Sequence, residues 1–209
     1  YISIILYVLQ SQLRSHWAME VENCSIDPMD LMYMCHANFA FVEGGQIVQP
    51  TGFGKDDTVI RSSVPAIVKA NESYLERLAA MKEDPSATEV IDPAIGFDPE
   101  LVFYLKNLRP AADGLVHVMM RRPAGDAFVV AYDPSIFSYL VRWILANNKQ
   151  KVCAFAMPAT CGVEGYSAEK RHGNVRSLAG GESTLFKLKL GYLNAAAAAV
   201  EESVIRASV

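Results

Sequence analysis

Short apolar segments follow one another closely along most of this chain, with turn-forming residues between them. After residue 100 they come in quick succession, and no helical segment separates one from the next. Parallel strands need long crossover connections, usually helices, so this spacing argues against a doubly wound parallel sheet. It predicts an antiparallel sandwich or barrel of about eight or nine strands. The expected later strands are 101–105, 114–121, 127–132, 140–144, 152–156 and 184–190.

The first fifty residues also favour strands. Apolar residues alternate at period two over 17–21, and an earlier strand is expected over 4–9. The apolar run 31–42 is predicted as one long strand. The turn at 43–46 leads into 47–49, a pattern typical of a hairpin.

Only two helices are expected. Residues 72–82 have apolar side chains at helical spacing and stop before Pro85, and the alanine-rich tail 194–209 favours a terminal helix. Residues 50–63 and 86–100 are predicted as irregular connections, and a long polar loop is expected after the strand at 152–156.

Length and composition fit one domain over residues 1–209, since 209 residues are 51% hydrophobic and 20% charged. The net charge of −4 argues against a nucleic-acid partner, and the apolar run 4–9 is too short to span a membrane. The four cysteines lack metal or disulfide spacing, which favours reduced thiols in the cytoplasm. The first residue is Tyr1, directly before an apolar run, so we interpret the chain as N-terminally truncated.

No local metal motif is present, because no two of the four histidines lie within five residues of each other. No metal and no cofactor are therefore predicted. A site with dispersed ligands, as in a cupin barrel, stays open as an alternative.

Three segments could carry chemistry. On a strand, His36 and Asn38 share one face, which suggests a pocket, although both could be core residues that bond backbone carbonyls. The polar loop holds Glu164, Tyr166 and Glu169 and is either functional or simply solvated. A third candidate is Asp98, which its position before Pro99 explains equally well as a turn former.

Together these segments resemble the C-terminal half of the aldose 1-epimerase-like family, in the galactose mutarotase-like superfamily. Residues 22–39 resemble its N…P…L…H-x-N/Y-F/W strand. Residues 152–192 resemble its closing segment, in which L-x-P-G-E reads LAGGE over 178–182 here. Residues 96–103 resemble its G-Y/F-D-x-x-F segment, and the resemblance spans most of 15–192.

The resemblance implies a β-supersandwich with a sugar-binding cleft on one sheet and an isomerase that interconverts the anomers of an aldose. His36 matches the general acid that protonates the ring oxygen, and Asn38 would line the pocket. Asp98 would contact the sugar. Tyr166 could stack on its face. The sugar-binding arginine and a further histidine of that family belong to the N-terminal half.

One departure from the family concerns the base. Met157 stands where the family has its glutamate, and a thioether is not a useful proton acceptor. Glu164, and after it Glu169, are the candidates to supply the carboxylate. The alternatives are a non-catalytic sugar-binding or sugar-sensing domain on the same fold, and a cupin-like metal isomerase or a purely structural β domain.

Overall fold

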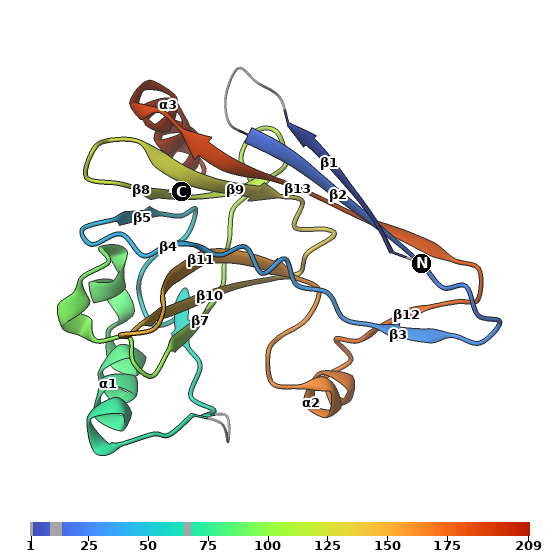
Figure 1. The fold of residues 1–209 in the computed structure, drawn as a ribbon, viewed down its shortest axis with the longest axis horizontal. Coiled ribbons are helices and arrows are strands. Elements are labelled where there is room, and N and C mark those ends of the chain that lie inside the picture. The colour runs from blue at the N-terminus through green and yellow to red at the C-terminus, as the bar shows by residue number, and fades with distance from the viewer. Residues whose placement is uncertain (1, 9–13, 65–67) are drawn as a thin grey trace.

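The computed structural model describes residues 2–8, 14–64 and 68–209. Two antiparallel sheets pack face to face, which confirms the predicted sandwich (Figure 1). In spatial order, the six-stranded sheet contains β1 (Ile2–Val8), β2 (Arg14–Glu22), β13 (Ser183–Leu193), β9 (Ala127–Tyr132), β8 (Val116–Arg121) and β5 (Gln46–Val48). The five-stranded sheet contains β4 (Phe39–Ala40), β11 (Lys151–Ala159), β10 (Tyr139–Ala146), β7 (Leu101–Leu105) and β6 (Thr58–Ile60). A separate pair joins β3 (Met29–Leu31) to β12 (Arg176–Leu178).

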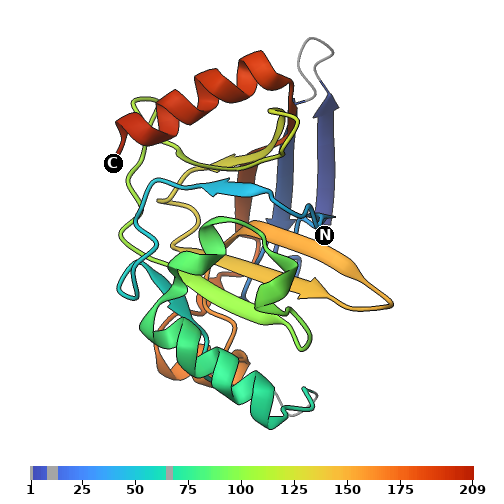
Figure 2. The same cartoon turned by 90° about the vertical axis from the view of Figure 1, so that its left-hand side faces the viewer.

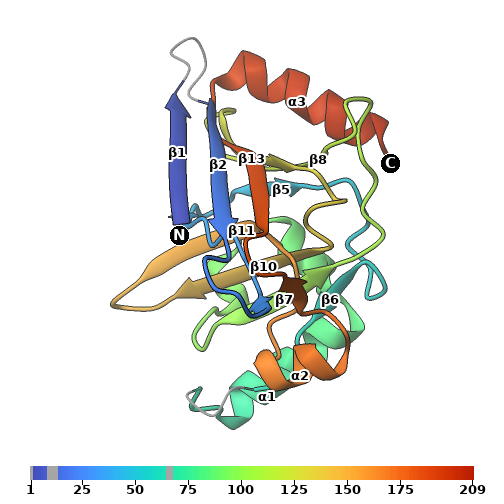
Figure 3. The ribbon, with the colours of Figure 1, turned by 90° about the vertical axis from the view of Figure 1, so that its right-hand side faces the viewer.

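The main core lies between the two sheets. Alternate residues of each strand point into it, as period-two geometry requires. Phe103 and Phe155 enter from the five-stranded sheet, and Val118 and Phe186 enter from the six-stranded sheet. Burying such a side chain stabilises the fold by roughly 1.5–3 kcal/mol. In Figure 3, β1, β2 and β13 run steeply across the direction of β10 and β11, so the strands of the two sheets are not aligned with each other.

One charged side chain lies inside this core. Arg142 of β10 is fully buried; its Nε donates to the Phe155 carbonyl oxygen at 3.0 Å, and its Nη2 donates to Gln49 Oε1 at 2.5 Å. Burial lowers the pKa of Arg142 to about 10. Because Gln49 directly follows β5, this bond ties the two sheets together.

Within the described ranges, three α-helices lie outside the sandwich: α1 (Glu72–Glu83), α2 (Tyr166–Arg171) and α3 (Ala195–Ala207). The predictions over 72–82 and 194–209 are thus confirmed, whereas α2 falls in the segment predicted as a loop. The side chain of Asn71 caps α1, and Pro85 opens the first of two 3₁₀ turns, η1 (Pro85–Glu89) and η2 (Pro93–Ile95). Figure 2 shows α3 above the six-stranded sheet and α1 on the side of the five-stranded sheet. Within the described residues, no helix is long and apolar enough to cross a membrane.

Two sequence predictions near residue 40 are wrong. Residues 31–42 do not form one strand; they contain the last residue of β3, the two residues of β4 and an isolated bridge from Met34 to Ala159. The turn at Gly44 does not close a hairpin either, because β4 pairs with β11 and β5 pairs with β8 in the other sheet. Apolar alternation and a glycine turn are local signals, and they do not specify which sheet a strand joins.

Regular structure also occurs in a segment predicted as a loop. The connection predicted over 50–63 contains β6, which pairs with β7 at the edge of the five-stranded sheet. Gln49 Nε2 holds the bend before β6 by donating to the Gly52 carbonyl oxygen at 2.9 Å and to Thr58 Oγ1 at 3.1 Å. A strand of three residues leaves little periodicity to detect.

A buried histidine of β8 bonds to α3 and so joins that helix to the six-stranded sheet. We expect this contact to make the stability of the fold depend on pH. His117 Nδ1 lies 2.6 Å from Glu201 Oε1, and its Nε2 lies 3.1 Å from both Asp113 oxygens. Burial alone would lower the pKa of His117, but these two carboxylates outweigh it and raise that pKa. The stabilisation is therefore fully present below the pKa of an unfolded histidine and is lost as pH rises through the higher folded pKa.

The melting temperature, followed by circular dichroism from about pH 6 to about pH 9, tests this linkage. The wild-type chain should lose stability toward the alkaline end. The Glu201→Gln variant should be less stable at acid pH and show a flatter profile, since it lacks one of the two carboxylates that raise the histidine pKa. Parallel profiles of the two proteins would contradict the assignment.

Candidate functional site

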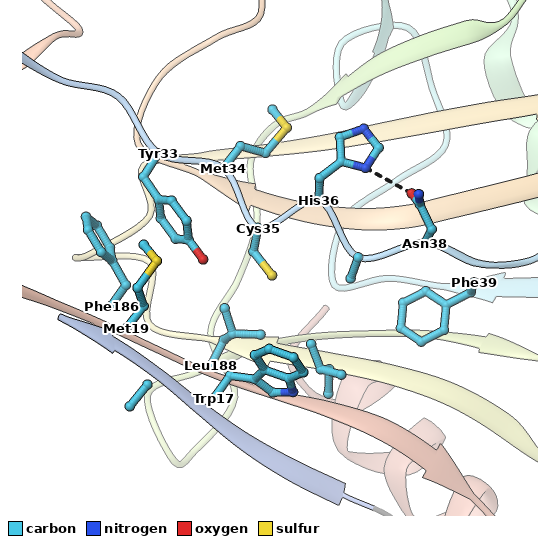
Figure 4. A pocket seen from close by; sticks show the side chains of 13 residues that line it. Trp17, Met19, Tyr33, Met34, Cys35, His36, Asn38, Phe39, Phe186 and Leu188 are labelled. Atoms are coloured by element: carbon cyan, nitrogen blue, oxygen red, sulfur yellow. Dashed lines mark hydrogen bonds between the residues drawn. The ribbon is translucent and has the colours of Figure 1, made fainter. Parts of the chain in front are cut away.

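Residues 33–39 run beside β11 and place the candidate histidine. The Cys35 N–H donates to the Pro158 carbonyl oxygen at 2.9 Å, so the backbone is anchored without a regular ladder. Side chains still alternate along the segment. Figure 4 shows Tyr33 and Cys35 pointing toward β2 and β13, and His36 and Asn38 pointing to the opposite side.

The side that faces β2 and β13 is an apolar groove of about 350 Å³. Trp17, Leu188 and Phe39 line it together with Cys35, while His36 and Asn38 lie at its border (Figure 4). Burial raises the pKa of the Cys35 thiol to about 11. The groove therefore offers little for acid–base chemistry.

His36 itself is exposed on the other side. Its Nδ1 lies 2.9 Å from Asn38 Oδ1, and its ring meets the ring of Trp143 edge-on, with centroids 5.5 Å apart and planes at 65°. An amide oxygen at Nδ1 favours the proton on that nitrogen, which leaves Nε2 for a ligand. The predicted pairing of His36 with Asn38 is thus present although the predicted strand is not.

Trp143 belongs to the outer face of the five-stranded sheet, which faces away from the sandwich core. A small apolar cluster there is built from Val102, Val141, Ala154 and Met157, with Trp143 and Tyr104 packed against it. Met157 is 2% exposed. Neighbouring side chains therefore bury the position at which the aldose 1-epimerase-like family would have its base.

Glu164 lies at the Tyr104 side of the same cluster. Its Oε1 accepts from the Tyr104 hydroxyl at 2.7 Å and from Arg61 Nε at 3.1 Å, and its Oε2 accepts from the Ser63 hydroxyl. Partial burial opposes the charge, but the hydrogen bonds from Ser63 and Tyr104 and the Arg61 guanidinium outweigh it and lower the pKa of Glu164. The carboxylate is therefore ionised and already holds three donors.

Glu169 organises the loop that carries Glu164. It is buried, and its carboxylate accepts from the Gly162 N–H at 3.0 Å, the Glu164 N–H at 3.2 Å and Asn174 Nδ2 at 2.7 Å. A Cβ on Gly162 would lie 2.6 Å from Glu169 Oε1, so any larger residue at this position would displace the carboxylate. In this arrangement Glu169 holds the loop in place and is not presented to a ligand.

The other two predicted site residues lie elsewhere. Asp98 is exposed and lies just before β7, at the opposite end of that strand from Tyr104. It lines a pocket together with Asn147. The Tyr166 hydroxyl donates to Asp30 and accepts from Lys170 Nζ at 2.8 Å. The described contacts join neither residue to His36.

Trp143 and Arg61 are the site residues that sequence reasoning missed. The signal for Trp143 was its position one residue before the buried Ile144, which alternation assigns to the outer face. Arg61 had no such signal, because it follows an unpredicted strand and meets Glu164 across 103 residues of sequence. Among the described residues, no three His, Cys, Asp or Glu side chains are grouped as metal ligands.

Comparisons with known proteins point to one fold. No protein-family model and no curated protein matches the sequence. The chain superimposes on a candidate aldose 1-epimerase from Klebsiella pneumoniae with a TM-score of 0.77 and 17% identity, over 99% of this chain and 50% of that one. A galactose mutarotase related enzyme from Lactobacillus acidophilus gives a TM-score of 0.56 and 14% identity, over 93% of this chain and 62% of that one. A galactose mutarotase-like protein from Lactobacillus casei gives 0.51 and 10%, over 91% and 62%.

The chain therefore spans 50% to 62% of the length of these three structures. The expected relationship in fold is confirmed by nearly complete coverage of this chain. The described residues have the fold of the galactose mutarotase-like proteins.

Proposed function

We propose that this chain is a carbohydrate-binding, aldose 1-epimerase-like protein, with its sugar on the outer face of the five-stranded sheet. The observation that supports this most is the exposed His36 set edge-on against Trp143. An aromatic ring beside a polar donor suits a pyranose, which has an apolar face and a rim of hydroxyls. The solved structures of similar fold include one named as a candidate aldose 1-epimerase and one named as galactose mutarotase-like.

In the proposed reaction, His36 acts as the general acid. The Asn38 amide oxygen holds the Nδ1 proton, so the imidazolium presents its Nε2 proton to the ring oxygen of the sugar. As that proton moves, a base removes the proton of the anomeric hydroxyl, the bond from C1 to the ring oxygen breaks, and C1 becomes an aldehyde. Rotation about the C1–C2 bond and reclosure give the other anomer.

Glu164 is the proposed base. A carboxylate has about four acceptor positions, and three are filled by Tyr104, Arg61 and Ser63, so one remains for the sugar hydroxyl. These donors also weaken the base, because each stabilises the ionised form. We therefore expect slower proton transfer than from a carboxylate whose pKa lies near neutrality.

The second candidate function is sugar binding without epimerisation. The buried Met157 favours it, because a thioether stands where the resemblance implies a catalytic carboxylate. Polarimetry of freshly dissolved aldoses separates the two candidates: acceleration of mutarotation supports the isomerase, and calorimetric binding without acceleration supports the binding domain.

Binding itself is tested at the indole, since both candidate functions use it. Trp143→Ala should weaken the calorimetric affinity for D-galactose by about 5- to 30-fold, from the loss of about 1–2 kcal/mol of ring contact. Trp143→Phe keeps a ring and should lose much less. Equal affinity of all three proteins would exclude the outer face as the sugar site.

A further inference from the structure

A second pocket opens beside Glu164, at the end of the five-stranded sheet where β7 leaves it. Its volume is about 600 Å³, and it lies between the residues that follow β7, those that precede β10 and the 162–174 loop. The residues that matter here are Tyr104, Lys106, Tyr139, Glu164, Glu169 and His172. We call it the lysine–histidine pocket. Because Tyr104 and Glu164 belong both to its wall and to the proposed sugar site, the two are continuous.

The charged side chains around this pocket differ in whether they have hydrogen-bond partners. Both carboxylates are engaged: Glu164 holds Arg61, Ser63 and Tyr104, and Glu169 holds two backbone N–H groups and an amide. Within the described part of the chain, by contrast, the Lys106 ammonium and the His172 ring have no hydrogen bond or ion pair. Among the described residues of the pocket, the charge left without a partner is therefore the positive charge of Lys106, although the whole chain carries −4.

The position of Lys106 directly after β7 also turns its side chain toward this pocket. Tyr104 lies on the outer face of β7, and period-two alternation places Lys106 on that same face. His172 stands at the C-terminal end of α2 and approaches from the loop. Two donors that enter one pocket from separate elements can hold two oxygens of one ligand group.

The loop wall is already organised without a ligand. Three hydrogen bonds to Glu169 fix residues 162–174, and Gly162 gives that carboxylate its room. A preorganised wall lowers the entropy cost of binding. The pocket therefore has the size, the rigid wall and the unpaired donors that a ligand subsite needs.

We propose that the lysine–histidine pocket selects sugars that bear an acidic substituent, such as a uronic acid carboxylate or a sugar phosphate. Lys106 and His172 bind the acidic oxygens, while the pyranose lies toward Tyr104 and His36. This inference rests on the proposed sugar site and narrows its substrate class. Carboxylates and phosphates accept charge-assisted hydrogen bonds that neutral hydroxyls do not match.

Isothermal titration calorimetry with three probes tests the proposal: D-glucose, D-glucuronate and D-glucose 6-phosphate, at low ionic strength. One or both acidic sugars should bind about 10-fold or more tightly than glucose, and added salt should reduce the difference. Lys106→Met and His172→Asn should each remove much of the preference without weakening glucose binding. Lys82→Met, at an exposed lysine of α1, is the matched control and should keep it.

The outcomes distinguish a failure of the acidic-sugar proposal from a failure of the proposed sugar site. Equal affinity for glucose and both acidic sugars would overturn the acidic-sugar proposal and leave the sugar site standing. A preference that survives in the Lys106→Met/His172→Asn double variant would overturn it as well. If none of the three sugars binds but D-galactose does, this inference fails alone. If D-galactose does not bind either, the proposed function fails with it.

Discussion

Replacing His36 with alanine should lower the acceleration of aldose mutarotation by about 10²- to 10⁴-fold, the usual contribution of a positioned general acid. The ring is exposed and its hydrogen bond goes to Asn38, so its loss leaves no buried group unpaired. The folded state should therefore be nearly unaffected. The measurement is polarimetry of freshly dissolved D-galactose with wild-type and variant protein at matched concentration.

Two control variants make that result specific to the proposed role. His16→Ala removes another histidine, on β2, and should leave the rate unchanged. Asn38→Ala removes the oxygen that holds the Nδ1 proton and should give a smaller loss than His36→Ala, because the acid remains but is less well oriented. A His36→Ala protein with the wild-type rate would exclude His36 as the acid.

Replacing Glu169 with alanine should lower the free energy of unfolding by about 3–5 kcal/mol. The substitution leaves the Gly162 and Glu164 N–H groups and the Asn174 amide without their acceptor, and each bond to a charged group is worth about 1.5–3 kcal/mol without full additivity. Urea denaturation followed by circular dichroism measures the loss. The fixed loop should become mobile as well, so the affinity for acidic sugars should fall.

Glu169→Gln retains one carbonyl oxygen and should cost about 1–2 kcal/mol, because it can still accept from part of the donor set. Glu76→Ala, at an exposed glutamate of α1, is the matched control and should change stability by less than about 0.5 kcal/mol. A loss below about 1 kcal/mol in Glu169→Ala would show that these bonds do not organise the loop.

The fold class could be predicted from the sequence because it depends on local patterns. Alternation identified β2, short apolar segments between turns identified β7 to β11 and β13, and helical spacing with the Pro85 stop identified α1, whereas the short β12 was missed. The path of residues 31–42 could not be predicted, because the partner of each short strand lies more than 100 residues away, as β11 does for β4. Pairing at that separation is decided by tertiary packing and not by the segment itself.

The candidate site was predictable only where its residues are neighbours in the chain. His36 and Asn38 share a face because alternation survives even without a regular strand (Figure 4). The contacts of His36 with Trp143 and of Glu164 with Arg61 join segments about a hundred residues apart, and no spacing rule encodes them. Likewise, the buried Arg142 contradicts the expectation that core strands are apolar, and its bonds to Gln49 and to the Phe155 carbonyl oxygen, both distant in sequence or in another strand, explain it.

A crystal structure of the chain grown with D-galactose tests the central claim most directly. The account predicts electron density for the sugar on the outer face of the five-stranded sheet, with a ring hydroxyl or the ring oxygen within hydrogen-bond distance of His36 Nε2 and the pyranose against Trp143. Density in the apolar groove beside Trp17, with the outer face left to solvent, would contradict it.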